Sequence, residues 1–267
     1  MADRLRVAVA GAAGRMGRAS IRAIAAQSDM AVVAALGRAS SIGTDAGAVA
    51  GIPPMGIPIL DTLEAALAGA DVLVDFSPGA AAADHARAAV PVGVSPVIGG
   101  TGMTATDLTD LAGLCEARGV GAVVAPNFAI GAVLMMEFAR QAAPHFPHVE
   151  IIELHHDRKR DAPSGTAVKT AVLVAAARGE APPAKVQEEE LVAGARGGRA
   201  AGIPVHSIRL PGLVAHQEVI FGGSGQTLTI RHDSISEESF MPGLLLAVRR
   251  VRALPGLVYG LEKLLFT

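Results

Sequence analysis

Two histidines and a lysine, His155, His156 and Lys159, stand close together in the run EIIELHHDRKRDAPSGT, residues 150–166. An imidazole exchanges a proton near neutral pH, and a lysine ammonium carries a full positive charge. If the run ends a strand, the two imidazoles point to opposite sides, so that one can face a pocket and the other form its wall. These residue types predict an acid that neutralises negative charge developing on a small molecule.

The same run ends in a helix start that suits an anion. Ser164 is a favourable N-cap residue, and the backbone N–H groups of Gly165 and Thr166 have no partners within the helix. These groups and the helix dipole attract negative charge. The pattern therefore predicts that a substrate carboxylate docks at Ser164, Gly165 and Thr166, near the charge of Lys159.

Two other interpretations of this run stay open. Histidines can be metal ligands, but adjacent histidines on a strand do not easily chelate one ion, and no further Cys or His stands at a metal-ligand spacing around them. A basic solvated loop is the second alternative, although it does not require a histidine pair, a lysine and a capped helix in so short a segment. We therefore expect no metal.

A glycine-rich loop follows the first apolar run of the chain. It comprises Gly11, Ala12, Ala13, Gly14, Arg15, Met16 and Gly17 and stands between a strand-like and a helical segment. Glycines allow a tight turn and the close approach of a pyrophosphate, whose charge the N–H groups of the helix start attract. The spacing is GxxGxxG in a chain with 31 glycines, so a plain tight turn is the alternative. The position between strand and helix favours dinucleotide binding.

The end of the second apolar run bears on the choice of cofactor. An NAD site usually places a carboxylate about 20 residues beyond the loop, where it holds the adenosine ribose. Here Gly37 and Arg38 stand at that position. A cation without a neighbouring carboxylate can pair with a 2′-phosphate, which predicts a preference for NADPH, with NADH use also possible. The alternative is that Arg38 is a solvated loop residue.

The elements that must position these residues alternate in the first half of the chain. Short apolar runs such as RVAVA, MAVVAAL and DVLVDF are separated by helical patterns, for example residues 15–27 and 106–118. Strands alternating with helices predict βαβ units and a parallel sheet covered on both faces. The expected fold class is α/β, with a Rossmann-like doubly wound sheet.

From about residue 149 the pattern changes to longer strand-like runs, with one clear helix at 165–177, which predicts a second α+β domain with a mixed sheet. Residues 178–202 are expected to be a flexible connection inside it, and 240–263 a closing helical stretch that packs on the first domain. We place the dinucleotide-binding domain at residues 1–126 and 237–267. The substrate-binding domain is placed at 127–236.

Composition narrows the possible partners. The formal charge of −2, from 23 basic and 25 acidic side chains, offers no positive field for a nucleic acid. The single cysteine, Cys115, has no intramolecular disulfide partner and fits a reducing cytoplasm. The longest charge-free stretch, residues 119–136, is divided by Pro126 and Asn127, so it predicts no membrane span. We expect a cytoplasmic protein that acts on a small molecule.

Together these motifs resemble one enzyme family. Residues 153–166 match the E-x-H-H-x-x-K-x-D-A-P-S-G-T signature of the 4-hydroxy-tetrahydrodipicolinate reductases, also called dihydrodipicolinate reductases. VAGAAGRMG at 9–17 is similar to the family's cofactor loop, and VIGGTG at 97–102 and APNF at 125–128 are similar to two further loops. The resemblance extends over essentially the whole chain.

The resemblance implies an NADPH- or NADH-dependent reduction of (2S,4S)-4-hydroxy-2,3,4,5-tetrahydrodipicolinate to tetrahydrodipicolinate with loss of water, in lysine biosynthesis by the diaminopimelate pathway. It implies that His155 is the proton donor or acceptor, that Lys159 is a second acid, and that His156 joins Gly165 and Thr166 in holding a substrate carboxylate. The implied cofactor contacts are the loop from Gly11, Arg38, Gly99, Gly100, Thr101, Ala125, Pro126, Asn127 and Phe128. A homotetramer assembled through the second domain's sheet is also implied.

Two positions depart from the family pattern. Gly37 stands where some members carry an acidic residue, which weakens the case for NADH, and Gly100 stands where threonine is common, which removes only a hydroxyl. Two other functions stay open. An amino-acid dehydrogenase, such as aspartate or homoserine dehydrogenase, should lack the His-His-x-x-Lys run. A non-catalytic nicotinamide-binding sensor has no support from a DNA-reading helix or a basic stripe.

Overall fold

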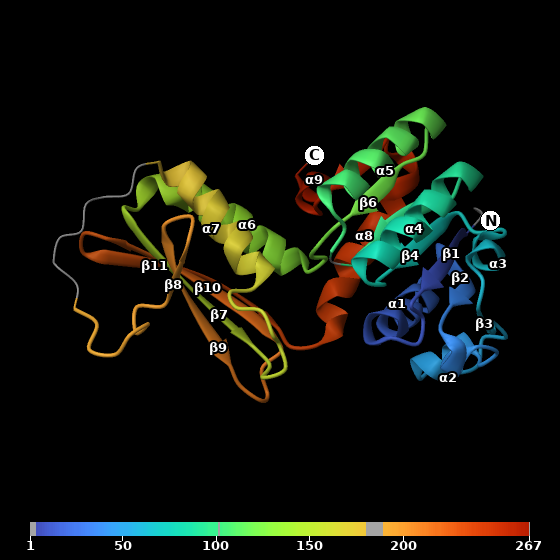
Figure 1. Cartoon of the computed structure of the whole chain (residues 1–267), viewed down its shortest axis with the longest axis horizontal. Coiled ribbons are helices and arrows are strands. Elements are labelled where there is room, and N and C mark those ends of the chain that lie inside the picture. Colours follow the sequence, from blue (N-terminus) through green and yellow to red (C-terminus); the bar gives the residue numbers. More distant parts are fainter. Residues whose placement is uncertain (1–3, 101, 180–188, 267) are drawn as a thin grey trace. The chain divides into compact units, whose positions relative to one another are not determined.

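The computed structural model describes residues 4–100, 102–179 and 189–266. The chain divides into two compact units, Met1–Ile130 with Glu237–Thr267, and Gly131–Ser236. Each unit has its own sheet (Figure 1). Residues 127–130, expected in the second domain, pack with the first unit, because Phe128 is buried and its ring meets that of Phe76 edge-on at 5.9 Å between centroids.

The first unit contains a seven-stranded sheet in the order β12-β6-β5-β4-β1-β2-β3, and every neighbouring pair is parallel. The strands are β1 (Leu5–Ala10), β2 (Met30–Leu36), β3 (Ile59–Leu60), β4 (Val72–Asp75), β5 (Ser95–Ile98), β6 (Ala122–Val124) and β12 (Leu257–Tyr259). The helices are α1 (Arg15–Ala25), α2 (Ala46–Ala50), α3 (Leu63–Leu67), α4 (Gly79–Ala89), α5 (Ala105–Arg118), α8 (Met241–Arg250) and α9 (Glu262–Leu265). The strand order reverses between β1 and β4, which confirms the doubly wound α/β fold.

The core of this unit explains why its strands are visible in the sequence. Residues 7–10 of β1 and 72–74 of β4 are fully buried. A strand covered on both faces reads as a continuous apolar run, which distinguishes it from the periodic pattern of the helices around it. Short 3₁₀ helices, at Ala39–Ser41, Val90–Val92, Ala143–His145, Glu237–Phe240 and Val251–Ala253, join longer elements of the chain.

The closing stretch is not the single helical segment that we expected over residues 240–263. Helix α8 ends at Arg250, β12 then adds an edge strand beside β6, and α9 follows. Pro255 and Gly256 stand immediately before β12. Proline supplies no backbone N–H and glycine is a poor helix former, so the helix does not continue through them.

The second unit contains a five-stranded sheet in the order β11-β10-β7-β9-β8. Its strands are β7 (His148–His155), β8 (Gly198–Ala200), β9 (Ile203–Arg209), β10 (Ala215–Gly223) and β11 (Gln226–Ser234), and its helices are α6 (Ile130–Ala142) and α7 (Gly165–Arg178). β7 and β9 are parallel and the other pairs antiparallel, which confirms a mixed sheet. Within the expected flexible connection, β8 pairs with β9, and residues 180–188 lie outside the described ranges.

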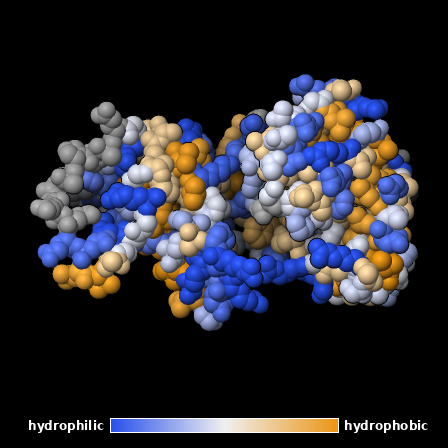
Figure 2. Space-filling model, in the orientation of Figure 1, coloured by the Kyte–Doolittle hydropathy of each residue, from blue (hydrophilic) through white to orange (hydrophobic). Residues whose placement is uncertain are grey.

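The two faces of the second sheet differ. Burial alternates along β7 and β10, where Glu153 and Gln217 are among the buried residues. The Gln217 side chain donates to the Thr170 hydroxyl of α7 at 2.7 Å, so α7 covers this face. Apolar residues also gather over α6 and α7 on the visible surface of this unit (Figure 2).

No helix among the described residues is long and apolar enough to cross a lipid bilayer.

Candidate active site

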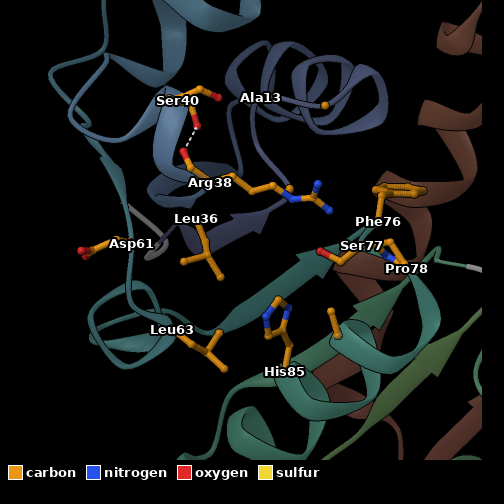
Figure 3. A pocket seen from close by; sticks show the side chains of 15 residues that line it. Ala13, Leu36, Arg38, Ser40, Asp61, Leu63, Phe76, Ser77, Pro78 and His85 are labelled. Atoms are coloured by element: carbon orange, nitrogen blue, oxygen red, sulfur yellow. Dashed lines mark hydrogen bonds between the residues drawn. The ribbon is translucent and has the colours of Figure 1, made fainter.

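A cavity of about 610 Å³ opens at the carboxyl edge of the first sheet, where the strand order reverses (Figure 3). It is lined by the glycine loop after β1, by the segment after β2, and by the connection from β4 to α4. Open α/β sheets bind ligands at such switch points. The volume lies in the range of small-molecule and cofactor sites.

The glycine loop has the geometry that a pyrophosphate requires. Gly11 has a φ of 69°, in the left-handed region, and Gly14 is the N-cap of α1. A β-carbon on Gly17 would lie 2.2 Å from the Gly11 carbonyl oxygen, so only glycine lets α1 pack this closely on the turn. Because Gly14 has no side chain to cap the helix, the N–H groups of its first turn stay available to an anion. The loop therefore fits a dinucleotide.

Arg38 carries positive charge into the cavity. Its exposed side chain extends across the opening toward Ser77 (Figure 3). Within the described residues its guanidinium has no ion-pair partner, and its backbone carbonyl accepts a hydrogen bond from the Ser41 hydroxyl at 2.9 Å. A β-carbon on the neighbouring Gly37 would lie 2.5 Å from side-chain atoms of Ile59 and Ser41. The acidic residue of some relatives therefore has no room here unless these side chains move.

A buried carboxylate that was not predicted from the sequence lies beside the cavity. Asp75, at the end of β4, is fully buried, and its Oδ1 accepts from the Ser77 N–H at 2.6 Å. Its Oδ2 lies 2.7 Å from Nδ1 of His85, a residue that lines the cavity. This hydrogen bond raises the pKa of His85 despite the opposing effect of burial. Asp75 could have been identified from the sequence because it is a polar residue at the carboxyl end of a buried strand, where such sheets bind ligands.

Gly99, Gly100 and residues 125–128, also expected to contact the cofactor, lie on the opposite side of the switch point and do not line the cavity. Gly99 and Gly100 follow β5, and residues 125–128 follow β6. A β-carbon on Gly100 would lie 2.0 Å from the Ser77 carbonyl oxygen, and one on Gly99 would lie 2.1 Å from the Phe76 ring. The close approach of the loops after β4 and β5 therefore accounts for glycine at position 100.

Several residues expected to contact the cofactor make other contacts within the protein. Ala12 is buried, and the Arg15 side chain pairs with Glu237 at 3.2 Å. The side chain of Asn127 accepts from the Ala129 N–H at 2.8 Å and so shapes the entry into α6. Thr101 lies outside the described residues.

In the second unit, one carboxylate joins the expected catalytic histidine to the helix start. Glu153 and His155 lie on the same face of β7, and Glu153 Oε2 is 2.5 Å from His155 Nδ1. The other oxygen, Oε1, accepts from the Ser164 N–H at 3.2 Å. The Ser164 hydroxyl accepts from the Ala167 N–H at 3.2 Å, which confirms that Ser164 caps α7. His155 and the start of α7 are therefore neighbours.

Arg209, at the end of β9, completes this cluster. Its guanidinium donates to both oxygens of Glu153, at 2.9 Å and 2.8 Å. Burial acts to raise the pKa of Glu153, but hydrogen bonds from His155, Arg209 and Ser207 hold it at about 2. Glu153 is therefore ionised at neutral pH. Glu153 opens the signature at 153–166, but neither Glu153 nor Arg209 was assigned a role from the sequence.

Lys159 lies in the loop between β7 and α7. Its Nζ is 2.8 Å from each oxygen of Asp161, and this contact lowers the pKa of the Asp161 carboxyl. The backbone oxygen of Asp161 accepts from Arg209 at 2.7 Å, so the lysine loop is tied to the Glu153 cluster. His156 is half-buried, and its carbonyl accepts from the Lys159 N–H at 3.2 Å.

The start of α7 has free space above it. A β-carbon on Gly165 would meet no heavy atom within 4 Å, and Gly165 is exposed. The expected substrate-binding residues Ser164, Gly165 and Thr166 therefore border an open position beside His155, where a small anion has room. Among the described residues, no group of three or more His, Cys, Asp or Glu is placed to hold a metal ion.

Comparisons with known proteins agree over both units. The sequence models described as "Dihydrodipicolinate reductase, N-terminus" and "Dihydrodipicolinate reductase, C-terminus" match residues 5–128 and 131–265. A 4-hydroxy-tetrahydrodipicolinate reductase of Moorella thermoacetica is 58% identical over 263 residues, 98% of each chain. One of Desulfitobacterium hafniense is 49% identical over 265 residues, 98% of this chain and 99% of that one.

Among solved structures, the dipicolinate-bound dihydrodipicolinate reductase from Paenisporosarcina sp. TG-14 superposes with a TM-score of 0.86. It is 42% identical and covers 98% of this chain and 99% of its own. An amine dehydrogenase from Mycobacterium smegmatis, with a TM-score of 0.66 at 14% identity over 96% of this chain and 95% of its own, shares the fold alone.

Proposed function

Because the chain belongs to the dihydrodipicolinate reductase family, we infer that it is an NAD(P)H-dependent oxidoreductase of lysine biosynthesis by the diaminopimelate pathway. It reduces 4-hydroxy-tetrahydrodipicolinate to tetrahydrodipicolinate with loss of water. The full-length identity sets aside the amino-acid dehydrogenases and the sensor. The observation that carries the mechanism is that Glu153 contacts both His155 and the open start of α7.

The cofactor site is proposed at the switch point of the first sheet. The glycine loop and the first turn of α1 would hold the pyrophosphate, and the loops after β5 and β6 are proposed for the nicotinamide half. When bound, the cofactor supplies a hydride. Arg38 supports a preference for NADPH, because its guanidinium has no ion-pair partner within the described residues and can meet a 2′-phosphate, while position 37 carries no carboxylate.

The substrate site is proposed at the start of α7. The N–H groups of Gly165 and Thr166 bind one carboxylate of the substrate, with His156 beside them, and the capping hydroxyl of Ser164 keeps this turn in place. The Paenisporosarcina relative binds dipicolinate, a dicarboxylate of the same class. Lys159 adds positive charge once its ammonium exchanges Asp161 for the substrate.

His155 is the proposed acid. Its Nδ1 is taken by the ionised Glu153, so Nε2 is the atom left to face the substrate. Reduction leaves negative charge on the ring of the substrate, and a proton from Nε2 neutralises it. Lys159 stabilises the same charge electrostatically.

We also propose that the protein is a cytoplasmic homotetramer. The face of the second sheet opposite α7 carries Ile152, Leu154, Ile208 and Ile220, which no helix of the described residues covers. Glu150, Glu218 and Arg231 lie on the same face, so this surface is mixed, and its apolar residues are of the kind that oligomers bury. This face is the surface that the assembly would use.

The test is a coupled assay with freshly made condensation product of pyruvate and aspartate semialdehyde. We expect oxidation of NADPH, with less efficient use of NADH. His155→Ala and Lys159→Ala should each lower turnover by about 100-fold or more while NADPH still binds, because only the acid–base step is lost. Arg38→Ala should raise the KM for NADPH but not that for NADH. Wild-type turnover in either of the first two variants would remove that residue from the mechanism.

A further inference from the structure

Glu153 binds neither substrate nor cofactor in the reaction proposed above, yet it is fully buried beside His155 and the start of α7. An isolated buried carboxylate is costly, and it persists only where several donors satisfy it. Here the donors come from three different elements. They are the imidazole of His155 on β7, the N–H of Ser164 at the start of α7, and the guanidinium of Arg209 on β9.

The charge of Glu153 fixes the state of the histidine. Because the pKa of Glu153 is about 2, its oxygens are acceptors at neutral pH, and the nitrogen that faces them must carry the hydrogen. The neutral imidazole is therefore the Nδ1–H tautomer, with its acceptor at Nε2. A proton gained by the ring is placed at Nε2, the atom that can deliver it to a ligand.

We propose that Glu153 is the positioning residue of this active site, holding His155 in one tautomer and orientation beside the anion-binding start of α7. The inference rests on the function proposed above, since it assigns Glu153 to the residue that moves the proton. One oxygen of the carboxylate orients the histidine, and the other holds the start of α7. Oε2 contacts His155, and Oε1 contacts the Ser164 N–H.

Arg209 extends the same arrangement to the lysine loop. It donates to both oxygens of Glu153 and also to the backbone oxygen of Asp161, whose side chain binds Lys159. One carboxylate thus connects the positions of the proposed acid, the proposed anion site and the second cation. Partners of this kind, which orient the groups that touch a ligand, typically change activity by about 10- to 100-fold when they are removed.

The chain offers a control in another carboxylate that is paired with an arginine. Glu137 lies on α6, and hydrogen bonds from Arg140 and Gln141 hold its pKa at about 2, as low as that of Glu153. Its Oε2 accepts from Arg140 Nε at 2.9 Å, and its Oε1 accepts from Gln141 at 2.8 Å. Glu137→Gln therefore removes the same charge from α6, which contributes no residue to the proposed substrate site.

The experiment compares Glu153→Gln, Glu153→Asp and Glu137→Gln. For Glu153→Gln we expect kcat to fall by about 10- to 100-fold, with unchanged NADPH affinity. Glu153→Asp keeps the carboxylate and should recover part of this loss. Glu137→Gln should behave as wild type.

A direct readout on the wild-type protein does not depend on the Glu153 variants. Nitrogen-15 NMR of the imidazoles in the full chain, with His155 assigned by its absence in His155→Ala, should show the Nδ1–H tautomer above neutral pH. The Nε2–H tautomer in the wild type would overturn the proposal.

The outcomes separate two failures. If His155→Ala is inactive while Glu153→Gln keeps the wild-type kcat, Glu153 does not position the acid, and the proposed function stands. If His155→Ala keeps full turnover, the proposed role of His155 is wrong instead. Equal losses in Glu153→Gln and Glu137→Gln, without recovery in Glu153→Asp, would reduce Glu153 to a structural residue and overturn the inference.

Discussion

At the scale of one residue, replacing Gly165 should affect substrate binding but not the stability of the fold. Its backbone does not need glycine, because φ is not positive and a β-carbon would meet nothing within 4 Å. Gly165→Ala should therefore leave the free energy of unfolding unchanged or raise it by less than about 1 kcal/mol. If the substrate carboxylate occupies the open space, the added methyl should raise the substrate KM by about tenfold, ~1.4 kcal/mol.

Steady-state kinetics and denaturant unfolding test this prediction together. Gly113→Ala is the control, since Gly113 also lies in a helix with open space around its β-carbon. It should leave both the KM and the reaction rate unchanged. A wild-type KM in Gly165→Ala would mean that the carboxylate binds elsewhere.

The Asp75–His85 pair predicts a pH-dependent contribution to stability. The hydrogen bond from Asp75 raises the pKa of His85 above its ordinary 6.5. The folded state therefore binds the proton more tightly than the unfolded chain. The stabilisation is complete below the unfolded value and is lost as pH rises through the higher folded pKa. Comparing wild type with His85→Gln, the difference in unfolding free energy should be larger near pH 6 than near pH 9. Equal differences at both would show that the pair is not charged in the folded protein.

At the scale of elements, the strands, helices and caps that the sequence predicts are those that depend on residues close together in the chain. The buried strands of the first sheet and the capped start of α7 follow from apolar runs, helical periodicity and one N-cap residue, all of which are local. The cluster around Glu153 is different, because Arg209 stands 56 positions later in the chain. Arg209 lies beside Glu153 because β9 pairs with β7 in the register that places Arg209 opposite His155. A register shift of one residue would turn Arg209 to the other face, and no local pattern specifies that register.

The packing of α1 on β1 gives a prediction at the same scale. A β-carbon on Gly17 would lie 2.2 Å from the Gly11 oxygen and 2.8 Å from the Ala12 Cα, and backbone atoms cannot move aside cheaply. Gly17→Ala should therefore destabilise the protein by about 1–3 kcal/mol. Because the displaced helix start is the proposed pyrophosphate site, NADPH affinity should fall as well. Denaturant unfolding and fluorescence titration measure the two effects. Unchanged unfolding would show that α1 can move off the turn without loss.

At the scale of the whole molecule, the proposed tasks divide between the units. The glycine loop, Arg38 and the Asp75–His85 pair belong to the first unit, and the Glu153 cluster with the start of α7 to the second. The sequence identifies one motif for each unit because each contains a local signature. The family resemblance implied a tetramer, but no single residue pattern specifies how many chains assemble. We propose that the second sheet provides the surface for assembly.

The open face of that sheet should determine the oligomeric state. Ile152, Leu154 and Ile220 are half-buried, Ile208 is exposed, and all lie opposite α7. If four chains bury these faces, Ile220→Glu would place an unpaired charge in the interface and dissociate the tetramer, while leaving NADPH binding by the first unit intact. Light scattering after size exclusion measures the mass. Val172→Glu, on the exposed side of α7, is the control and should keep the wild-type mass. A monomeric wild type, or a tetrameric Ile220→Glu alongside a dissociated Val172→Glu, would move the interface away from this face.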